Sequence, residues 1–587
     1  MVEARFRWTF PEVVALPAGL AEAAERAGIS QRLAGLLARR GVMTEEDLAA
    51  WFGTPLDGLH DPARLPDAGK LVERLRRARD AGERVQVFGD FDADGLTGLA
   101  IMTLALRRFG VDPVPYVPSR LDEGHGLSHA ALDAAEAAGV TLIVTVDCGT
   151  TSHSEIAVAA LRGLDVIVTD HHRVPEVMPP AHAVVNPQRP DSTYPDRRLA
   201  GSGVAFKIAQ LLLADTPDGR QAALDLADLA TIGTVADVAP IVGENRAIAR
   251  LGLELLRHGP RPGVAALLER ARIDPSAVDL ETVSFSVAPR LNAAGRMGEA
   301  LEAARLLLAD DPAQAGLHAD RLESANAARR DLTRTVVAEA RAMVAGSPSA
   351  AASVVHGPWS VGIVGLVAAR LVEDEGRPAV VGAELGDVIR ASCRSDGSLD
   401  LGATLERCGD LFLRHGGHAG AAGFELPADR WDAFRERFLD LAAAAAPADP
   451  RASIAIDLAL PALEVDYGLY REVSQLAPCG PGNADACVAV LGLTVTRVRA
   501  ANGGHSQLTL RRGLDVLDGI AFGRPDIAEV VREGDRLDVV ARLTSRSFGG
   551  FESLQLDIRD VATAGSHPDA VSILERDAAV AIAGLTR

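Results

Sequence analysis

The stretch Val85-Gln86-Val87-Phe88-Gly89-Asp90-Phe91-Asp92-Ala93-Asp94-Gly95 decides the fold of the first half of the chain. Its first residues form an apolar run typical of a short buried strand, and the acidic loop after it leads into a helical apolar pattern from Leu99 to Phe109. The next segments repeat this order, with predicted helices at 128–138 and 154–162 and predicted strands at 141–146 and 164–169. Strands that alternate with helices at this spacing predict βαβ units and a parallel sheet.

Three carboxylates, those of Asp90, Asp92 and Asp94, occupy alternate positions of the acidic loop. Like charges this close repel one another and raise one another's pKa, and a bound divalent cation offsets that cost. The competing interpretations are a solvated acidic turn and a calcium loop. A calcium loop of the EF-hand type needs a glutamate at its twelfth position, where this chain has Ile101.

Acidic and imidazole side chains also follow the next two predicted strands directly. Asp147 follows the first of them, and Asp170, His171 and His172 follow the second. Because the carboxyl ends of parallel strands meet at one edge of a sheet, these residues are expected to converge with the acidic loop. Asp237, in the stretch 231–240, is a further candidate, although taken alone it would be an ordinary acidic residue of a loop.

Carboxylates combined with one or two imidazoles suit Mn²⁺ or Mg²⁺ better than Zn²⁺, which prefers thiolate and imidazole. One bridging aspartate can hold two such ions ~4 Å apart, an arrangement that activates water and stabilises the leaving oxygen of a phosphoryl displacement. The sequence therefore predicts two divalent metal ions, Mn²⁺ or Mg²⁺, and hydrolysis of a phosphoester or phosphoanhydride.

Composition narrows the class of protein. The chain has 587 residues, enough for about three or four domains, and a net charge of -20, which argues against a protein coated in basic surface. Its two lysines, Lys70 and Lys207, are not set in a Walker A loop, and its five cysteines form no CxxC pair. Without a long apolar run or a leader pattern, the chain is expected to be cytoplasmic and to have no membrane association.

Changes in composition predict the domain boundaries. The chain is divided into a helical N-terminal segment (1–65), a first α/β domain (66–300), a long connecting helix (301–347), a second α/β domain (348–446), a β domain (451–565) and a tail (566–587). The β domain contains short strands separated by glycine-rich turns, which predicts a small barrel or sandwich.

Four motifs resemble those of the DHH phosphoesterase superfamily, and a fifth resembles the glycine–histidine motif of the DHH-associated domain. They are Asp90–Gly95, Val146–Thr150, Asp170–His172, Ala236–Val238 and Gly416–Gly420. Within this superfamily the chain is most similar to the RecJ exonucleases, over about residues 1–565. Further similar stretches are 118–127, 186–190, 199–206, 243–246, 288–296, 390–395 and 478–483.

The resemblance implies an α/β fold in which a parallel-sheet DHH domain and a second α/β DHH-associated domain are joined by a long helix, with a C-terminal OB-like β-barrel. It also implies a single-stranded-DNA-specific 5′→3′ exonuclease that hydrolyses phosphodiester bonds with two metal ions in DNA repair and recombination. A single-strand-binding protein and a helicase are the implied protein partners, and a monomer is expected.

Two other functions compete with this one. A DHH phosphoesterase acting on nanoRNA or small nucleotides resembles the two α/β domains but lacks an OB-like domain, so residues 450–565 argue against it. A non-catalytic binding protein derived from the same superfamily would have lost metal carboxylates, and this chain has all of them.

The resemblance also implies residue roles. Asp147 is expected to bridge the two ions, Asp90 to support or join the first of them, and the other metal ligands are Asp92, Asp94, His171 and Asp237. With Asp147, the catalytic group includes His172, which would contact the scissile phosphate, and Asp170, which would orient the histidines. The chain departs from the family at Phe91 and His125, where tyrosine is usual, and at Cys393, where a small residue is frequent.

Substrate-binding residues are implied in the same way. Arg120, Ser392 and Arg394 match positions for the 5′-terminal phosphate, and Arg290, Arg296 and His418 match other substrate-facing positions. In the OB-like domain, arginines are expected to follow phosphates and phenylalanines to stack on bases. The candidates are Arg497, Arg499, Arg511, Arg512, Arg542, Arg546, Phe522, Phe548 and Phe551.

Overall fold

The structure, a computed structural model, describes residues 2–11, 16–120, 123–298, 300–346, 349, 351–446, 449, 451–548 and 551–567. The chain forms two compact units. One unit comprises residues 53–448 and 480–482, and the other comprises 1–52, 449–479 and 483–587. Among the described residues, no helix combines the length and apolar character needed to cross a membrane.

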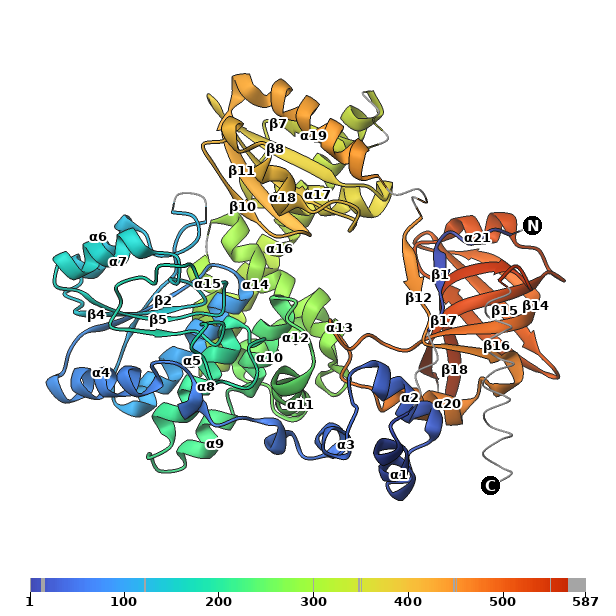
Figure 1. The fold of residues 1–587 in the computed structure, drawn as a ribbon, viewed down its shortest axis with the longest axis horizontal. Helices are drawn as coiled ribbons and strands as arrows, with labels where there is room; N and C mark the ends of the chain where they lie inside the picture. The colour runs from blue at the N-terminus through green and yellow to red at the C-terminus, as the bar shows by residue number, and fades with distance from the viewer. Residues whose placement is uncertain are drawn as a thin grey trace. The chain divides into compact units, whose positions relative to one another are not determined.

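A five-stranded parallel sheet lies at the centre of the first α/β domain (Figure 1). Its order is β3-β2-β4-β5-β6, with bounds Val114–Tyr116, Val85–Gly89, Leu142–Val146, Asp165–Thr169 and Ala183–Val185. The central strands β2, β4 and β5 agree with the predicted ones. The edge strands β3 and β6 were not predicted, because three residues are too few to show a periodic pattern.

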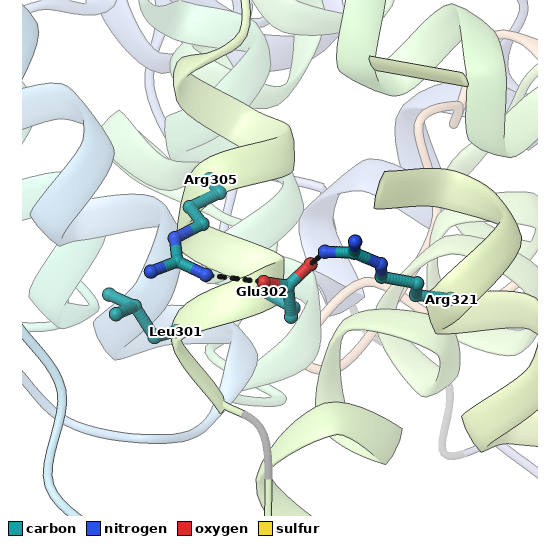
Figure 2. Close-up of a pocket in the computed structure, with 4 residues that line it drawn as sticks. All are labelled: Leu301, Glu302, Arg305 and Arg321. Carbon is teal, nitrogen blue, oxygen red and sulfur yellow. Dashed lines mark hydrogen bonds and ion pairs between the residues drawn. The ribbon is translucent and has the colours of Figure 1, made fainter. Parts of the chain in front are cut away.

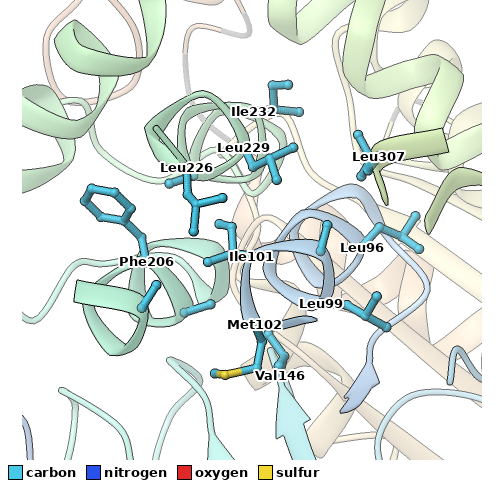
Figure 3. Close-up of a cluster of buried hydrophobic side chains, with 14 of the residues drawn as sticks. Leu96, Leu99, Ile101, Met102, Val146, Phe206, Leu226, Leu229, Ile232 and Leu307 are labelled. Atoms are coloured by element: carbon cyan, nitrogen blue, oxygen red, sulfur yellow. The ribbon is translucent and has the colours of Figure 1, made fainter. Parts of the chain in front are cut away.

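Helices cover both faces of this sheet. On one face lie α4 (Ala68–Ala81), α5 (Ala93–Phe109), α8 (Gly201–Leu213) and α10 (Ala227–Ala236), and on the other α6 (His129–Ala137) and α7 (His153–Leu161). Figure 3 shows α5 packed between neighbouring helices, with Leu96, Leu99 and Ile101 pointing in different directions. A helix that is apolar around most of its circumference must be buried, so α5 places the acidic loop at its start inside the domain.

Further helices complete this domain. They are α9 (Gly219–Leu224), α11 (Gly243–His258), α12 (Pro262–Ala271), α13 (Leu280–Thr282), the π-helical turn η4 (Val283–Val287) and α14 (Ala288–Met297).

The connecting segment, predicted as one helix from 301 to 347, consists of two helices. These are α15 (Ala300–Leu308) and α16 (Pro312–Gly346). Pro312 cannot donate a backbone hydrogen bond and therefore favours the first position of a new helix. Asp311 accepts hydrogen bonds from the N–H groups of Ala313 and Gln314, so it caps α16 and ends the continuous helix that composition alone suggested.

The second α/β domain is built on a mixed sheet of order β10-β11-β9-β8-β7, in which only β7 and β8 are parallel. The strands are Arg414–Gly417, Ala421–Pro427, Val388–Arg394, Ala379–Leu385 and Ser353–Gly357, and the helices are α17 (Val361–Glu375), α18 (Leu401–Glu406) and α19 (Trp431–Ala445). Along β9, every second residue is buried in the core, which leaves Arg390, Ser392 and Arg394 on the opposite face.

The other unit contains a closed five-stranded barrel in which β14 pairs with both β15 and β17. Its strands are β14 (Cys487–Ala501), β15 (His505–Arg512), β16 (Asp515–Ala521), β17 (Arg536–Phe548) and β18 (Phe551–Thr563), and β13 (Leu458–Pro461) extends the sheet beside β14. Two short helices, α20 (Tyr467–Ser474) and α21 (Pro525–Val530), belong to the same unit.

The N-terminal residues are part of the barrel unit. Strand β1 (Arg7–Thr9) pairs in parallel with β12 (Ser453–Ala455), and α1 (Ala18–Arg26), α2 (Gln31–Arg39) and α3 (Glu45–Phe52) share the core of the barrel. The fully buried Asp560 accepts hydrogen bonds from the backbone of Phe6 and from the indole of Trp8. The two ends of the described chain are thus joined in one hydrophobic core.

Candidate metal centre

The acidic loop is positioned by the start of α5. Asp92 is the N-cap residue, and its Oδ1 accepts hydrogen bonds from the N–H groups of Asp94 and Gly95, both at 3.0 Å. Asp90, at the end of β2, lies 2.9 Å from the Nδ1 atom of His125. Strand end and helix start together fix the orientations of these carboxylates.

Asp94 and Asp147 are held beside α8 and α10, where glycine is required. The carboxylate of Asp94 accepts hydrogen bonds from the first N–H groups of α8, those of Gly201 (2.7 Å) and Ser202 (2.9 Å). A Cβ atom at Gly201 would lie 2.5 Å from Oδ1 of Asp147, and one at Gly233 would lie 2.5 Å from Oδ1 of Asp94. The helices therefore approach the two carboxylates more closely than any other residue type would allow.

His171 lies between three carboxylates. Its Nε2 atom is 3.1 Å from Oδ1 of Asp147 and 3.9 Å from Oδ2 of Asp94, and its Nδ1 atom is 3.9 Å from Oδ2 of Asp237. The Nε2 atom of His171 and Oδ1 of Asp147 are buried and form no hydrogen bond within the described residues. Such atoms normally have a partner, so their convergence fits a bound cation.

The ligand atoms form three overlapping groups, in each of which all atoms lie within 4.8 Å of one another. The groups are Asp90, Asp92 and Asp147; Asp94, His171 and Asp237; and Asp147, His171 and His172. Asp147 belongs to two of these groups, the first and the third. This arrangement suits two adjacent ions with one shared carboxylate.

Burial and mutual repulsion raise the pKa values of three of these acids, Asp92, Asp147 and Asp237. Burial, together with the charges of Asp90 and Asp94, raises the pKa of Asp92 to about 6. The same two causes raise the pKa of Asp237 to about 7 and that of Asp147 well above its ordinary value. The group therefore carries negative charge that the protein itself does not neutralise, and divalent cations would compensate it.

Asp170 and His172 form a separate pair beside the carboxylate group. Oδ1 of Asp170 is 2.8 Å from Nδ1 of His172 and also accepts hydrogen bonds from the backbone of His171 and His172. Burial opposes ionisation of Asp170, but the interactions with His172 outweigh it and hold the pKa of Asp170 far below its usual value. The hydrogen bond to Asp170 raises the pKa of His172 to about 9, and the half-exposed ring leaves Nε2 available to a ligand.

Three of the predicted substrate-binding arginines, Arg120, Arg296 and Arg394, lie near one another. Arg120 and Arg296 also lie near the carboxylates. Arg120 packs over the Phe91 ring at 4.8 Å, and Arg296 donates to Gly362 O at 2.9 Å, which links α14 to the second α/β domain. Burial and the charges of neighbouring arginines, among them Arg120 and Arg394, lower the pKa of Arg296 to about 9. Several guanidinium groups that repel one another mark a site for an anion.

Ser392 and Arg394 share one face of β9 and lie opposite Gly365 of α17. A Cβ atom at Gly365 would be 3.1 Å from Nη2 of Arg394 and 3.5 Å from Oγ of Ser392. The close packing of the helix against this face thus orients both side chains.

The structure does not place Arg290 and His418 in this arginine group. Arg290 is paired with Glu323 at 2.6 Å. His418 is exposed in the turn between β10 and β11.

A cavity of about 380 Å³ lies at α15 and α16, outside the candidate site (Figure 2). Its lining includes Glu302, which accepts hydrogen bonds from Arg305 and Arg321, so the carboxylate in this cavity is already neutralised. None of the predicted site residues lines it.

Two residues near the site were not predicted. Oδ1 of Asn292 accepts a hydrogen bond from Ala93 N (2.8 Å) and so supports the acidic loop, although Asn292 lies within a stretch already recognised as similar to the family. Arg329 of α16 lies near Arg296, and its Nε atom is buried without a hydrogen bond in the described chain. No local pattern distinguishes Arg329 from other arginines of the same helix.

On the barrel, strand alternation separates arginines that the sequence placed together. Arg511 is exposed, whereas its neighbour Arg512 is largely buried and lies 3.7 Å from Asp515. Arg542 is paired with Asp485 and Asp557. Arg512 and Arg542 thus already have carboxylate partners, and their role along a DNA strand stays a prediction.

The other barrel candidates differ in their surroundings. Arg497, Arg499 and Arg546 are exposed or near the surface, and Phe522 is 57% exposed. The side chains of Phe548 and Phe551 lie outside the described part of the structure.

Family models match the first α/β domain, the second α/β domain and the barrel of this chain. The N-terminal domain of the DHH family matches residues 84–234, the DHHA1 domain matches residues 347–444, and the RecJ OB domain matches residues 456–560.

Individual relatives extend these matches over most of the chain. The single-stranded-DNA-specific exonuclease RecJ of Bacillus subtilis is 34% identical over 545 residues, which cover 92% of this chain and 69% of the relative. Its counterpart in Salmonella typhimurium is 33% identical and covers 90% of this chain and 95% of the relative. The crystal structure of Thermus thermophilus RecJ in complex with Mn²⁺ is similar with a TM-score of 0.81 and 30% identity, over 96% of this chain and 80% of that one. A second structure of that protein is in complex with Mg²⁺.

Proposed function

The chain belongs to the RecJ family, and from this premise we propose that it is a metal-dependent 5′→3′ exonuclease specific for single-stranded DNA. The observation that carries the proposal is the position of the arginine group beside the carboxylate group that contains Asp147. Adjacent cation and anion sites are what hydrolysis of a phosphodiester at a strand end requires.

Two divalent ions fit the observed donors. Asp90, Asp92 and Asp147 would hold one ion, and Asp94, Asp147, His171 and Asp237 would hold the other. When bound, the ions supply a nucleophilic hydroxide and stabilise negative charge on the phosphate. The RecJ structures with Mn²⁺ and with Mg²⁺ support either ion in this chain.

The chain's own residues position the substrate. Asp170 holds Nδ1 of His172, so Nε2 can donate a hydrogen bond to an oxygen of the scissile phosphate. Arg120, Ser392 and Arg394 would bind the 5′-terminal phosphate and thereby fix the register of the strand at the metal centre.

Replacement of Arg394 by alanine should reduce the preference for 5′-phosphorylated over 5′-hydroxyl ends by roughly 10- to 100-fold, the usual value of a charge-assisted hydrogen bond. The measurement is kcat/KM on matched oligonucleotides with either end. Arg390→Ala is the matched control, because Arg390 lies on the same face of β9 but is paired with Glu425. Equal discrimination before and after the Arg394 change would remove Arg394 from the phosphate site.

The OB-like barrel supports a long single strand as the substrate, and it is the feature that argues against nanoRNA or small nucleotides. If Arg511 contacts a phosphate, Arg511→Ala should weaken binding and reduce the slope of log K against log salt by ~0.7, the value per phosphate for single strands. Arg532→Ala, at another exposed arginine, is the control. An unchanged slope for Arg511→Ala would exclude this residue from the DNA path.

The enzyme is proposed to act as a monomer in the cytoplasm, in DNA repair and recombination, together with a single-strand-binding protein and a helicase. Digestion of end-labelled single-stranded and duplex DNA with Mn²⁺, Mg²⁺ or a chelator tests the central proposal. The expected result is metal-dependent shortening of single strands from the 5′ end. Degradation that survives chelation, or that prefers duplex ends, would contradict it.

A further inference from the structure

Phe285 is the most exposed of the phenylalanines whose side chains the structure describes, at 75%. It lies in the middle of the π-helical turn η4, whose end residues Val283 and Val287 are buried in the core. The turn is thus anchored by two valines and presents an aromatic ring to solvent. Exposure of such a ring is unfavourable, and π-helical turns occur frequently at functional sites.

The surroundings of Phe285 are basic. Nη1 of Arg290 donates to Ser286 O at 2.7 Å, which places this guanidinium beside η4. Arg329 and Arg330 of α16 are close enough to Arg290 for the three charges to interact, and with burial these charges lower the pKa of Arg329.

One carboxylate of this region is shared between arginines and so offsets only part of their charge. Glu323 lies 2.6 Å from Arg290 and 3.7 Å from Arg330, so two of the three arginines share one glutamate. An excess of positive charge therefore remains next to the exposed ring.

The ring and the metal centre are connected by one helix. Helix α14 follows η4 directly, and its residue Asn292 binds Ala93 N in the acidic loop. Seven residues separate Phe285 from Asn292, which corresponds to about 10 Å along a helix. Phe285 therefore lies within a few nucleotides of a phosphate held at the metals.

We propose that Phe285 stacks on an unpaired base of the DNA strand whose 5′ end occupies the metal centre, and that Arg329 and Arg330 contact the phosphates of the same segment. This inference rests on the proposed function. Surfaces that bind single-stranded nucleic acids combine aromatic rings, which stack on bases, with arginines, which contact phosphates. Phe285 and the arginines around it have this composition, whereas a protein interface usually has a broad apolar patch. Bases in a duplex are already stacked and paired, so such a contact favours a single strand.

The test compares Phe285→Ala, Phe285→Leu and Phe285→Trp on 5′-phosphorylated oligonucleotides of two and twelve nucleotides. Loss of one stacked base should raise KM for the twelve-mer by about 5- to 100-fold and leave kcat unchanged. The dinucleotide, too short to reach Phe285, should be unaffected. Tryptophan should restore the wild-type KM, whereas leucine, which is apolar but cannot stack, should not.

A binding measurement without turnover accompanies the kinetics. In the Asp147→Ala background, 2-aminopurine placed at successive positions of the twelve-mer should be quenched at one position, and Phe285→Ala should abolish that quenching. An unchanged KM for the twelve-mer, or an equal increase for the dinucleotide, would overturn the proposal. If the wild-type chain degraded no single-stranded DNA, the proposed exonuclease function would fail, and the quenching pattern would still decide whether Phe285 stacks on a base.

Discussion

Replacement of Asp147 by alanine is expected to reduce DNA hydrolysis by about 10³-fold or more while the protein remains folded. Asp147 is shared by two groups of potential metal ligands, so its loss should weaken the binding of both ions. Metal ions contribute several kcal/mol of transition-state stabilisation in such reactions, and each 1.4 kcal/mol corresponds to about a factor of ten in rate.

Metal-dependent stability provides a second measurement for this site. In the wild-type chain, Mn²⁺ should raise Tm, because it binds the folded state. Asp147→Asn, which keeps the shape beside Gly201, should lose most of that increase. Without metal, however, Asp147→Asn should be more stable than the wild-type chain, because it removes one buried charge from a repelling group.

Asp133→Asn is the control for both experiments, since Asp133 is exposed and pairs with Arg162 at the surface. It should change neither turnover nor the effect of Mn²⁺ on Tm. Near-normal turnover in a folded Asp147→Ala protein would contradict the assignment of Asp147 as a bridging ligand.

Replacement of Lys207 by methionine is expected to lower the free energy of unfolding by about 3–5 kcal/mol, the usual effect of removing one partner of a buried ion pair. Nζ of Lys207 lies 2.9 Å from Glu244, and both side chains are fully buried. Glu244 also accepts hydrogen bonds from His60 N and from Tyr194 OH, and Lys207 donates to His60 O. Without the lysine, the carboxylate would remain buried and would lose its charged partner.

A second substitution distinguishes the effect of the unpaired Glu244 charge from the effect of altered packing at Lys207. Lys207→Met combined with Glu244→Gln removes the unpaired charge and keeps an acceptor for Tyr194, so it should recover a large part of the lost stability. Urea unfolding followed by circular dichroism measures both variants. Arg334→Met, at a pair with Asp331 that is exposed to solvent, should cost less than about 1 kcal/mol. A similarly small loss for Lys207→Met would show that the buried pair contributes little.

The local sequence contained enough information for the central part of the fold. Strands β2, β4 and β5 have five residues each, most of them apolar, and are followed by acidic or imidazole residues, so both their structure and their common edge could be predicted. The edge strands β3 and β6 are too short for any period to be recognised. The break between α15 and α16 depends on Asp311, which caps the start of α16. The composition of the segment favours a continuous helix, so this break could not be predicted from composition.

Interactions between distant segments could not be predicted. Strand β1 pairs with β12, more than 440 residues later, and no local pattern indicates that partner. The pairing of Arg290 with Glu323 and of Arg542 with Asp557 likewise depends on which elements pack together. An arginine expected to face a substrate can therefore be neutralised by a carboxylate from elsewhere in the chain.

The sequence by itself determined the chemistry of this protein, because the residue types that bind divalent ions follow consecutive strands and parallel strands end at one edge. Only the tertiary structure decided which charged groups lack a partner within the protein and so remain available to bind metal ions or DNA. It brings Oδ1 of Asp147 and Nε2 of His171 to 3.1 Å without a hydrogen bond, and it leaves Phe285 exposed beside Arg290. Charge compensation and burial depend on distances between segments that are remote in sequence, and folding alone sets those distances.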